Sequence, residues 1–159
     1  MTTKDHHYCI QLNWTGNNDT NVAKFRNHNR SYTLSANGKP TISGSSDAVF
    51  RGDSTRWNPE DLLVASLSAC HHLWYMGLCA AAGIIVTAYE DEGKGVMVED
   101  KFDGAGQFKE VILRPCVTLA LDSNKEIAES LHHTAHERCF IARSVNFPVT
   151  VIPVTRFPF

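Results

Sequence analysis

The feature that most constrains this fold is a long apolar segment with strong helix-start and helix-end signals. Asn58 is a good N-cap residue, Pro59 suits the first helical position, and the two acids after it complement the positive end of a helix dipole. Gly83 stands where a C′ residue ends a helix. The apolar residues between them cover most of the helical circumference, which is typical of a central helix. We therefore predict a buried helix over residues 59–82.

The rest of the chain has mainly strand and turn character. A second helix is expected to open at residues 122–126, where Ser123 and Glu126 have capping-box spacing, and to end near Cys139. Pro148 and Pro153 bracket the last predicted strand and indicate a sheet edge. This order of elements predicts an α+β fold and not a repeating βαβ fold. The strands are expected at 8–14 (half-buried), 22–25, 31–34, 41–43, 84–90, 95–99, 110–121 and 147–154.

Composition narrows the class of protein further. The length of 159 residues predicts a single domain over residues 1–159. A net charge of −2 without a basic cluster predicts no nucleic-acid partner. The N-terminus lacks an apolar signal region, and polar residues interrupt every apolar run before it reaches the ~18–20 residues of a membrane span. We therefore expect no membrane association and a cytoplasmic location.

The five cysteines differ in setting. Their odd number and wide spacing argue against a structural disulfide framework and favour a reducing compartment. Cys70 lies inside the predicted helix, and Cys79 lies on the opposite helical face, so these two cannot form a disulfide within the helix. Cys139 has Arg138 and Arg143 near it in sequence, and such charges lower a thiol pKa. Cys79 is interpreted as a core residue and Cys116 as core or surface filling, whereas Cys9 is uninformative.

At this point the sequence resembles the OsmC-like branch of the OsmC/Ohr family (osmotically inducible protein C / organic hydroperoxide resistance). The segment Asn58–Cys70, NPEDLLVASLSAC, has the N-P-E-x-L helix start of that family, with a cysteine ten residues after the Glu. The segment Cys139–Val145 falls where the family keeps a second cysteine. The resemblance runs from about Phe50 to the end of the chain. It implies an OsmC-like α+β fold, with antiparallel sheets around a long buried central helix, in an intertwined homodimer.

The resemblance also implies a chemistry, namely a thiol-dependent peroxidase that reduces organic hydroperoxides to alcohols. Cys70 would attack the peroxide, and Cys139 would resolve the resulting sulfenic acid as a disulfide. A thiol reductant, either a dithiol or a lipoyl protein, would then reset the pair. The resemblance implies no cofactor and no metal.

A cation must favour the thiolate of Cys70, and in the family an arginine held by the Glu of the N-P-E motif does this. Glu60 matches that Glu. The position expected for the arginine, just before Phe50-Arg51-Gly52, is Val49 here. We predict Arg51 first and Arg56 second as the source of the charge. Arginines of the early strands are the alternative: Arg26 and Arg30.

Two further hypotheses stay open. One is a non-catalytic relative that binds a thiol or a small apolar ligand, because the expected arginine is displaced. The other is a cysteine acyl-transfer enzyme that uses His71, although adjacent helical residues point about 100° apart. His132 and His136 have the spacing of metal ligands, but without an acidic or cysteine companion they are interpreted as part of a solvated helix face.

Overall fold

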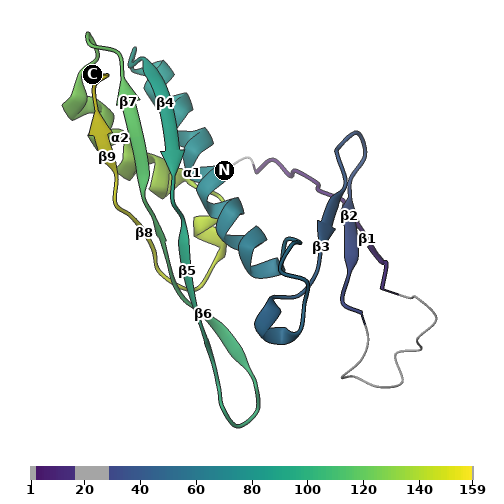
Figure 1. The fold of residues 1–159 in the computed structure, drawn as a ribbon. Coiled ribbons are helices and arrows are strands. Elements are labelled where there is room, and N and C mark those ends of the chain that lie inside the picture. Colours follow the sequence, from purple (N-terminus) through teal and green to yellow (C-terminus); the bar gives the residue numbers. More distant parts are fainter. Residues whose placement is uncertain (1–2, 17–28, 159) are drawn as a thin grey trace. The chain divides into compact units, whose positions relative to one another are not determined.

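The computed structural model describes residues 3–16 and 29–158 (Figure 1). Contacts divide the chain into two units, residues 1–62 and 63–159, and each is described by itself. The prediction of a single domain over residues 1–159 therefore stays a prediction. The strand expected at 22–25 lies outside the described residues.

The first unit contains a three-stranded antiparallel sheet in the order β1-β2-β3. The half-buried strand predicted over 8–14 is wrong in the single chain, because the strand begins only at Gln11 and its apolar face is exposed. Tyr8 is 87% exposed, Ile10 69% and Leu12 56%. A short 3-10 turn, η1 (Ala48–Phe50), precedes the long helix. The strands are β1 (Gln11–Trp14), β2 (Tyr32–Ser35) and β3 (Ile42–Gly44).

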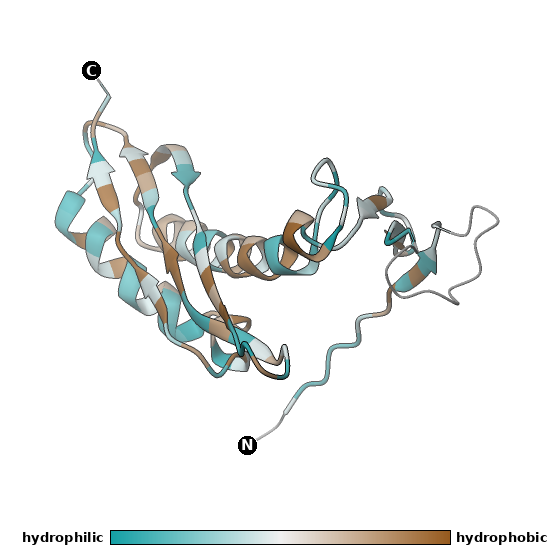
Figure 2. Cartoon of the chain, turned by 60° about the horizontal axis from the view of Figure 1, so that its bottom comes forward, coloured by the Kyte–Doolittle hydropathy of each residue, from teal (hydrophilic) through white to brown (hydrophobic). Residues whose placement is uncertain are grey.

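The long helix α1 (Pro59–Ala81) confirms the strongest sequence signal. The Asn58 side chain accepts a hydrogen bond from the Asp61 backbone N–H at 2.7 Å, and Gly83 ends the helix at φ 72°. Its expected burial all round is not found, because the single chain packs only one side of it. Leu73 is 70% exposed, and Figure 2 shows hydrophobic residues recurring along α1. Its buried residues are spaced four apart: Leu67, His71, Tyr75 and Cys79.

The second unit contains two three-stranded sheets, in the orders β4-β7-β9 and β5-β6-β8. The resemblance implied antiparallel sheets, and this expectation is wrong for both sheets of the second unit. Strand β6 pairs with β8 in parallel, and β7 pairs with β9 in parallel. The helix α2 connects β7 to β8 and β9. Such a crossover connection allows strands to pair in parallel, whereas a hairpin turn would make them antiparallel. The single strand predicted over 147–154 is wrong, since the structure has two strands there, but both lie at sheet edges, as the two prolines predicted. The strands are β4 (Val86–Asp91), β5 (Lys94–Glu99), β6 (Gly106–Leu113), β7 (Pro115–Leu119), β8 (Val149–Val151) and β9 (Val154–Arg156).

The single strand predicted over 110–121 is two strands in the structure. The chain leaves the ladder at Arg114, whose backbone N–H donates instead to the Asp91 carboxylate at 2.7 Å. Pro115, which has no N–H to offer, then begins β7. This break lets β6 and β7 join different sheets.

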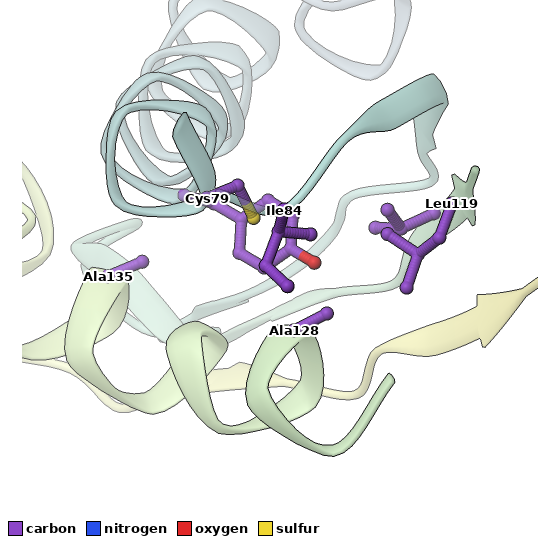
Figure 3. Close-up of a cluster of buried hydrophobic side chains, with 7 residues drawn as sticks. Cys79, Ile84, Leu119, Ala128 and Ala135 are labelled. Carbon is purple, nitrogen blue, oxygen red and sulfur yellow. The ribbon is translucent and has the colours of Figure 1, made fainter. Parts of the chain in front are cut away.

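The second helix, α2 (Lys125–Arg138), ends at the predicted place, with Cys139 as its C-cap. Its N-cap is Asn124 and not Ser123, because the Ser123 hydroxyl accepts a hydrogen bond from the Ile85 backbone N–H at 3.0 Å. Figure 3 shows side chains of α1, α2 and the strands meeting in one core cluster. The cluster comprises Tyr75, Cys79, Ile84, Val117, Leu119, Ala128 and Ala135.

Among the described residues, α1 is long and apolar enough by length and composition to cross a membrane. The sequence analysis expected no apolar run of membrane-spanning length, because polar residues interrupt the apolar residues of this helix. Those interruptions bind other elements, since the Ser68 hydroxyl donates to Asp91 and His71 pairs with His132. These hydrogen bonds tie α1 to β4 and α2 within the second unit.

Candidate functional site

Two cysteines distant in sequence meet in the second unit. Cys70 lies about three turns into α1 and is half-buried, whereas Cys139 is 1% exposed at the end of α2. The Cys139 sulfur accepts a hydrogen bond from the Ala142 backbone N–H at 3.4 Å, at the start of the short turn η2 (Ala142–Ser144). The Cys139 carbonyl accepts another, from the Arg143 N–H at 3.0 Å. The backbone thus anchors Cys139 on both of its acceptor atoms.

The two thiols interact directly, and both are in the free, reduced state. Burial raises the pKa of Cys139 to about 11, and a hydrogen bond to Cys70 adds to this effect. A hydrogen bond that raises a thiol pKa is one that the protonated form donates. Cys139 is therefore a protonated thiol at neutral pH, and the lower pKa expected from Arg138 and Arg143 is not found.

An aromatic rim lies beside these cysteines. Trp74 follows Cys70 by one helical turn and meets Phe140, the neighbour of Cys139, edge to face at 5.5 Å between ring centroids. The Arg138 guanidinium lies 5.9 Å from the Trp74 ring centroid, within the range of a cation–π contact. Phe140 is 68% exposed. The rim offers an apolar surface to a molecule that approaches the cysteine pair.

The other residues predicted for the site lie in the first unit. Glu60 occupies the first turn of α1, and its Oε2 atom is buried without a hydrogen-bond partner among the described residues. Burial raises the pKa of Tyr32, and the charge of Glu60 adds to that rise. A pocket of about 280 Å³ in this unit is lined by Arg30 and Tyr32, and by Pro59, the neighbour of Glu60.

Arg51 and Arg56 lie in the loop before α1. Arg51 caps η1 with φ 64°, in the left-handed region. Val49 itself is 79% exposed. The Arg56 guanidinium pairs with Asp53 at 3.2 Å. The structure thus places Cys70 with Cys139 in one unit and Glu60, Arg51 and Arg56 in the other, and the roles of all five stay predictions.

The sequence analysis missed a buried pair of histidines between the two helices. His71 is 1% exposed and His132 3%, and the His71 Nε2 atom lies 3.0 Å from the His132 Nδ1 atom. The expected solvated face is therefore wrong for His132. The missed signal is its position in the apolar stripe of α2, four residues after Ala128 and three before Ala135. Among the described residues, no three His, Cys, Asp or Glu side chains gather into a group that could hold a metal ion.

The buried histidines predict a loss of stability in mild acid. Burial lowers the pKa of His71 to about 4 and that of His132 to about 3; the charge of Asp91 opposes the shift of His71 without cancelling it. A histidine of the unfolded chain has a pKa of about 6.5, so between pH ~6.5 and ~4 the unfolded state binds protons that the folded state does not. The free energy of unfolding should therefore fall across that window, by up to about 1.4 kcal/mol per pH unit for each imidazole.

Urea denaturation at pH 7.5, 6 and 5 measures this loss. Replacing His132 with leucine should flatten the pH dependence, while replacing the exposed His133, which pairs with Glu137 at 3.3 Å, should leave it unchanged. A urea midpoint that stays constant from pH 7.5 to 5 in the parent protein would contradict the prediction.

Comparison with known proteins gives a consistent result. Residues 52–153 match the family model described as OsmC-like protein. An OsmC-like protein of unknown function from Vibrio cholerae has a TM-score of 0.85 at 26% identity, over 94% of this chain and 100% of that chain. An organic hydroperoxide resistance protein from Elizabethkingia anophelis has a TM-score of 0.66 at 20% identity, over 98% and 100%. The organic hydroperoxide resistance protein OhrB of Bacillus subtilis has a TM-score of 0.57 at 20% identity, over 93% and 98%. A search of curated proteins gives no match.

Proposed function

This chain belongs to the OsmC-like protein family, and from that premise we propose that it is a thiol-dependent peroxidase that reduces organic hydroperoxides to alcohols. The observation that carries the proposal is the hydrogen-bonded pair of free thiols, Cys70 and Cys139, brought together from distant parts of the sequence. The structural neighbours from Elizabethkingia anophelis and Bacillus subtilis are named organic hydroperoxide resistance proteins, which supports the same reaction class.

The reaction proceeds in two steps. The Cys70 thiolate attacks the terminal oxygen of R–O–O–H, the O–O bond breaks, and the alkoxide leaves and takes up a proton as the alcohol. Cys70 then carries a sulfenic acid. The Cys139 sulfur attacks the Cys70 sulfur, the S–O bond breaks, and the hydroxyl leaves as water with the Cys139 proton. A dithiol or lipoyl protein reduces the disulfide and completes the cycle.

The environments of the two thiols support this division of roles. Cys70 is half-buried beside the aromatic rim, where a peroxide has access, and Cys139 is almost fully buried. The pKa of Cys139, about 11, keeps it protonated, so it is a poor first nucleophile. Its S–H donates to Cys70 and stabilises the anion there. The buried, protonated thiol of Cys139 is therefore assigned the resolving role, and the more accessible Cys70 the attacking role.

The proposal requires a cation beside the Cys70 thiolate. Arg51 and Arg56 are the predicted sources, and the pairing of Arg56 with Asp53 shows that this guanidinium already has a carboxylate partner. Arg30 lines a pocket whose wall includes the neighbour of Glu60, which supports the alternative from the early strands. Single arginine-to-methionine variants at these positions, compared by the pH dependence of Cys70 alkylation, identify the residue that matters.

We further propose that the protein works as a homodimer built on α1. An exposed face of this helix carries residues spaced four apart, Ala65, Ala69, Leu73 and Gly77, which lets a second helix approach closely. Apolar residues along β1 are also exposed. Both surfaces would gain burial from a second copy of the chain.

Replacing Leu73 with aspartate should convert the dimer to a monomer. Size-exclusion chromatography with light scattering measures the mass, which is 17.7 kDa for one chain. Leu121 is the matched control, because it is 74% exposed but lies on the loop after β7, away from the α1 face. A Leu73→Asp protein that keeps the mass of the parent dimer, or a monomeric parent, would disprove this arrangement.

Titration of the reduced protein with cumene hydroperoxide tests the proposed activity. Thiol quantification and peptide mapping should show that Cys70 and Cys139 are lost together and appear as one disulfide. The other cysteines should stay reduced, as expected for a protein of the cytosol. Unchanged thiols at both positions would favour the alternative of a non-catalytic protein that binds a thiol or a small apolar ligand.

A further inference from the structure

The separation of the two reactive sulfurs depends on how α2 lies against α1. Cys70 belongs to α1, whereas Cys139 caps α2, so a rotation or slide of one helix on the other moves one sulfur relative to the other. The fully buried apolar residues of α2 are Ala128 and Ala135, both with 0% exposure, and Leu131 packs partly buried beside them. Methyl groups let the helices approach, but their contacts have little directional preference. A directional contact is needed to fix the alignment.

The histidine pair supplies such a contact in the buried part of the helix pair, whereas the cation–π contact of Arg138 with Trp74 involves an exposed guanidinium. Among the described residues, the hydrogen bond between side chains of α1 and α2 is the one between His71 Nε2 and His132 Nδ1, at 3.0 Å. The His132 ring also stacks on Tyr75 of α1, with 3.8 Å between ring centroids and 13° between planes. The His132 side chain is thus held by α1 both along its ring edge and across its face.

The location of this pair ties it to the cysteines. His71 directly follows Cys70, and His132 lies seven residues before Cys139, or about 10 Å along a helix at 1.5 Å per residue. Each histidine is therefore rigidly connected through helix backbone to one of the two sulfurs. Burial lowers the pKa values of both imidazoles, so both are neutral at pH 7, and one N–H and one lone pair form the bond between them.

We propose that His71 and His132 are a positioning pair, whose hydrogen bond fixes α2 on α1 so that the Cys139 sulfur is held against Cys70 for disulfide formation. This inference rests on the proposed function, because it concerns the resolving step of that reaction. The pair touches neither substrate nor the reacting atoms. Its effect is to raise the effective concentration of one thiol at the other.

Disulfide exchange with glutathione measures this effective concentration without any peroxide. The reduced protein and oxidised glutathione form the Cys70–Cys139 disulfide and two reduced glutathione molecules, and alkylation with mass spectrometry gives the equilibrium ratio. Failure of the parent protein to consume cumene hydroperoxide would refute the peroxidase, yet the exchange assay would still report on alignment. The two failures are therefore distinguishable.

Asparagine and glutamine form a matched pair of substitutions. The Asn amide reaches about the position of a histidine Nδ1 atom, whereas the Gln amide reaches about that of Nε2, and both remove the aromatic ring. His132 bonds through Nδ1, so His132→Asn should retain the parent equilibrium within about threefold, while His132→Gln should lower it about tenfold or more. His71 bonds through Nε2, so the order should reverse, with His71→Gln retained and His71→Asn impaired. His133→Gln, at the exposed neighbour, should have no effect.

The reversal between the two positions is the decisive result, because loss of packing alone would not produce it. Urea midpoints of the reduced variants show in parallel whether each one is folded. Equal effects of Asn and Gln at both positions would overturn the proposal, as would an unchanged equilibrium in the folded His132→Gln and His71→Asn variants. Failure of all four variants to fold would also overturn it, since the pair would then serve folding and not alignment.

Discussion

Replacing Cys70 with serine is expected to lower the rate constant for reduction of cumene hydroperoxide by at least about 10³-fold. A serine hydroxyl does not ionise near neutral pH, and the thiolate is the nucleophile that attacks the peroxide oxygen. The substitution is nearly isosteric and the position is half-buried, so the fold should persist. Stopped-flow measurement of peroxide consumption under single-turnover conditions gives the rate constant.

Cys116 provides the control for this experiment. It is also half-buried and free, but it lies on β7 in register with Glu90, away from the pair of interacting thiols. Cys116→Ser should therefore react at the parent rate. A Cys70→Ser protein that still reduces peroxide, or a Cys116→Ser protein that does not, would refute the assignment of Cys70 as the attacking residue.

The α1 helix shows what the sequence could and could not predict about the fold. Its ends follow from local chemistry, a capping Asn58 and a left-handed Gly83, and these signals act within a few residues. Its burial depends on what packs around it, which local pattern does not specify. Leu73 is apolar, yet it is 70% exposed in the single chain. The apolar pattern therefore gave a wrong prediction of burial within one chain, although the local end signals placed the helix correctly.

The strand predictions failed where a tertiary contact overrode the alternating pattern. Residues 110–121 alternate well, yet the Arg114 N–H bonds to Asp91, a residue far away in sequence. That contact divides the pattern into β6 and β7, which join different sheets. The parallel pairing of β8 with β6, and of β9 with β7, likewise depends on the path of the chain through α2, which strand patterns do not encode.

The roles of the site residues stay predictions, but the motif did indicate one specific pair of cysteines. The cysteine spacing and the N-P-E helix start indicated which two of five cysteines to pair, and the structure brings the thiols of Cys70 and Cys139 into contact. His132 was missed because a histidine in a polar-looking helix is usually solvated. Its place in the stripe between Ala128 and Ala135 carries the signal, since both flanking positions are fully buried. A polar residue in an apolar stripe predicts a buried partner, here His71.

Replacing Cys139 with serine is expected to permit one turnover and then to stop the reaction. Without added thiol, Cys70 should accumulate as the sulfenic acid, because no second thiol is present to displace the hydroxyl. Excess peroxide should then oxidise Cys70 further to the sulfinic acid. Intact-protein mass spectrometry and trapping with dimedone distinguish these states. Formation of a disulfide between Cys70 and another cysteine of the chain would contradict the assignment of Cys139 as resolving residue.

A second substitution at this position separates the two roles of Cys139. Serine can still donate a hydrogen bond to the Cys70 sulfur, as the Cys139 thiol does, but alanine cannot. Neither variant can resolve the sulfenic acid. Loss of a hydrogen bond to a charged group is worth about 1.5 kcal/mol or more, so the first turnover of Cys139→Ala should be about tenfold slower than that of Cys139→Ser below the pKa of Cys70. Equal first-turnover rates would show that Cys139 resolves the intermediate without stabilising the thiolate that forms it.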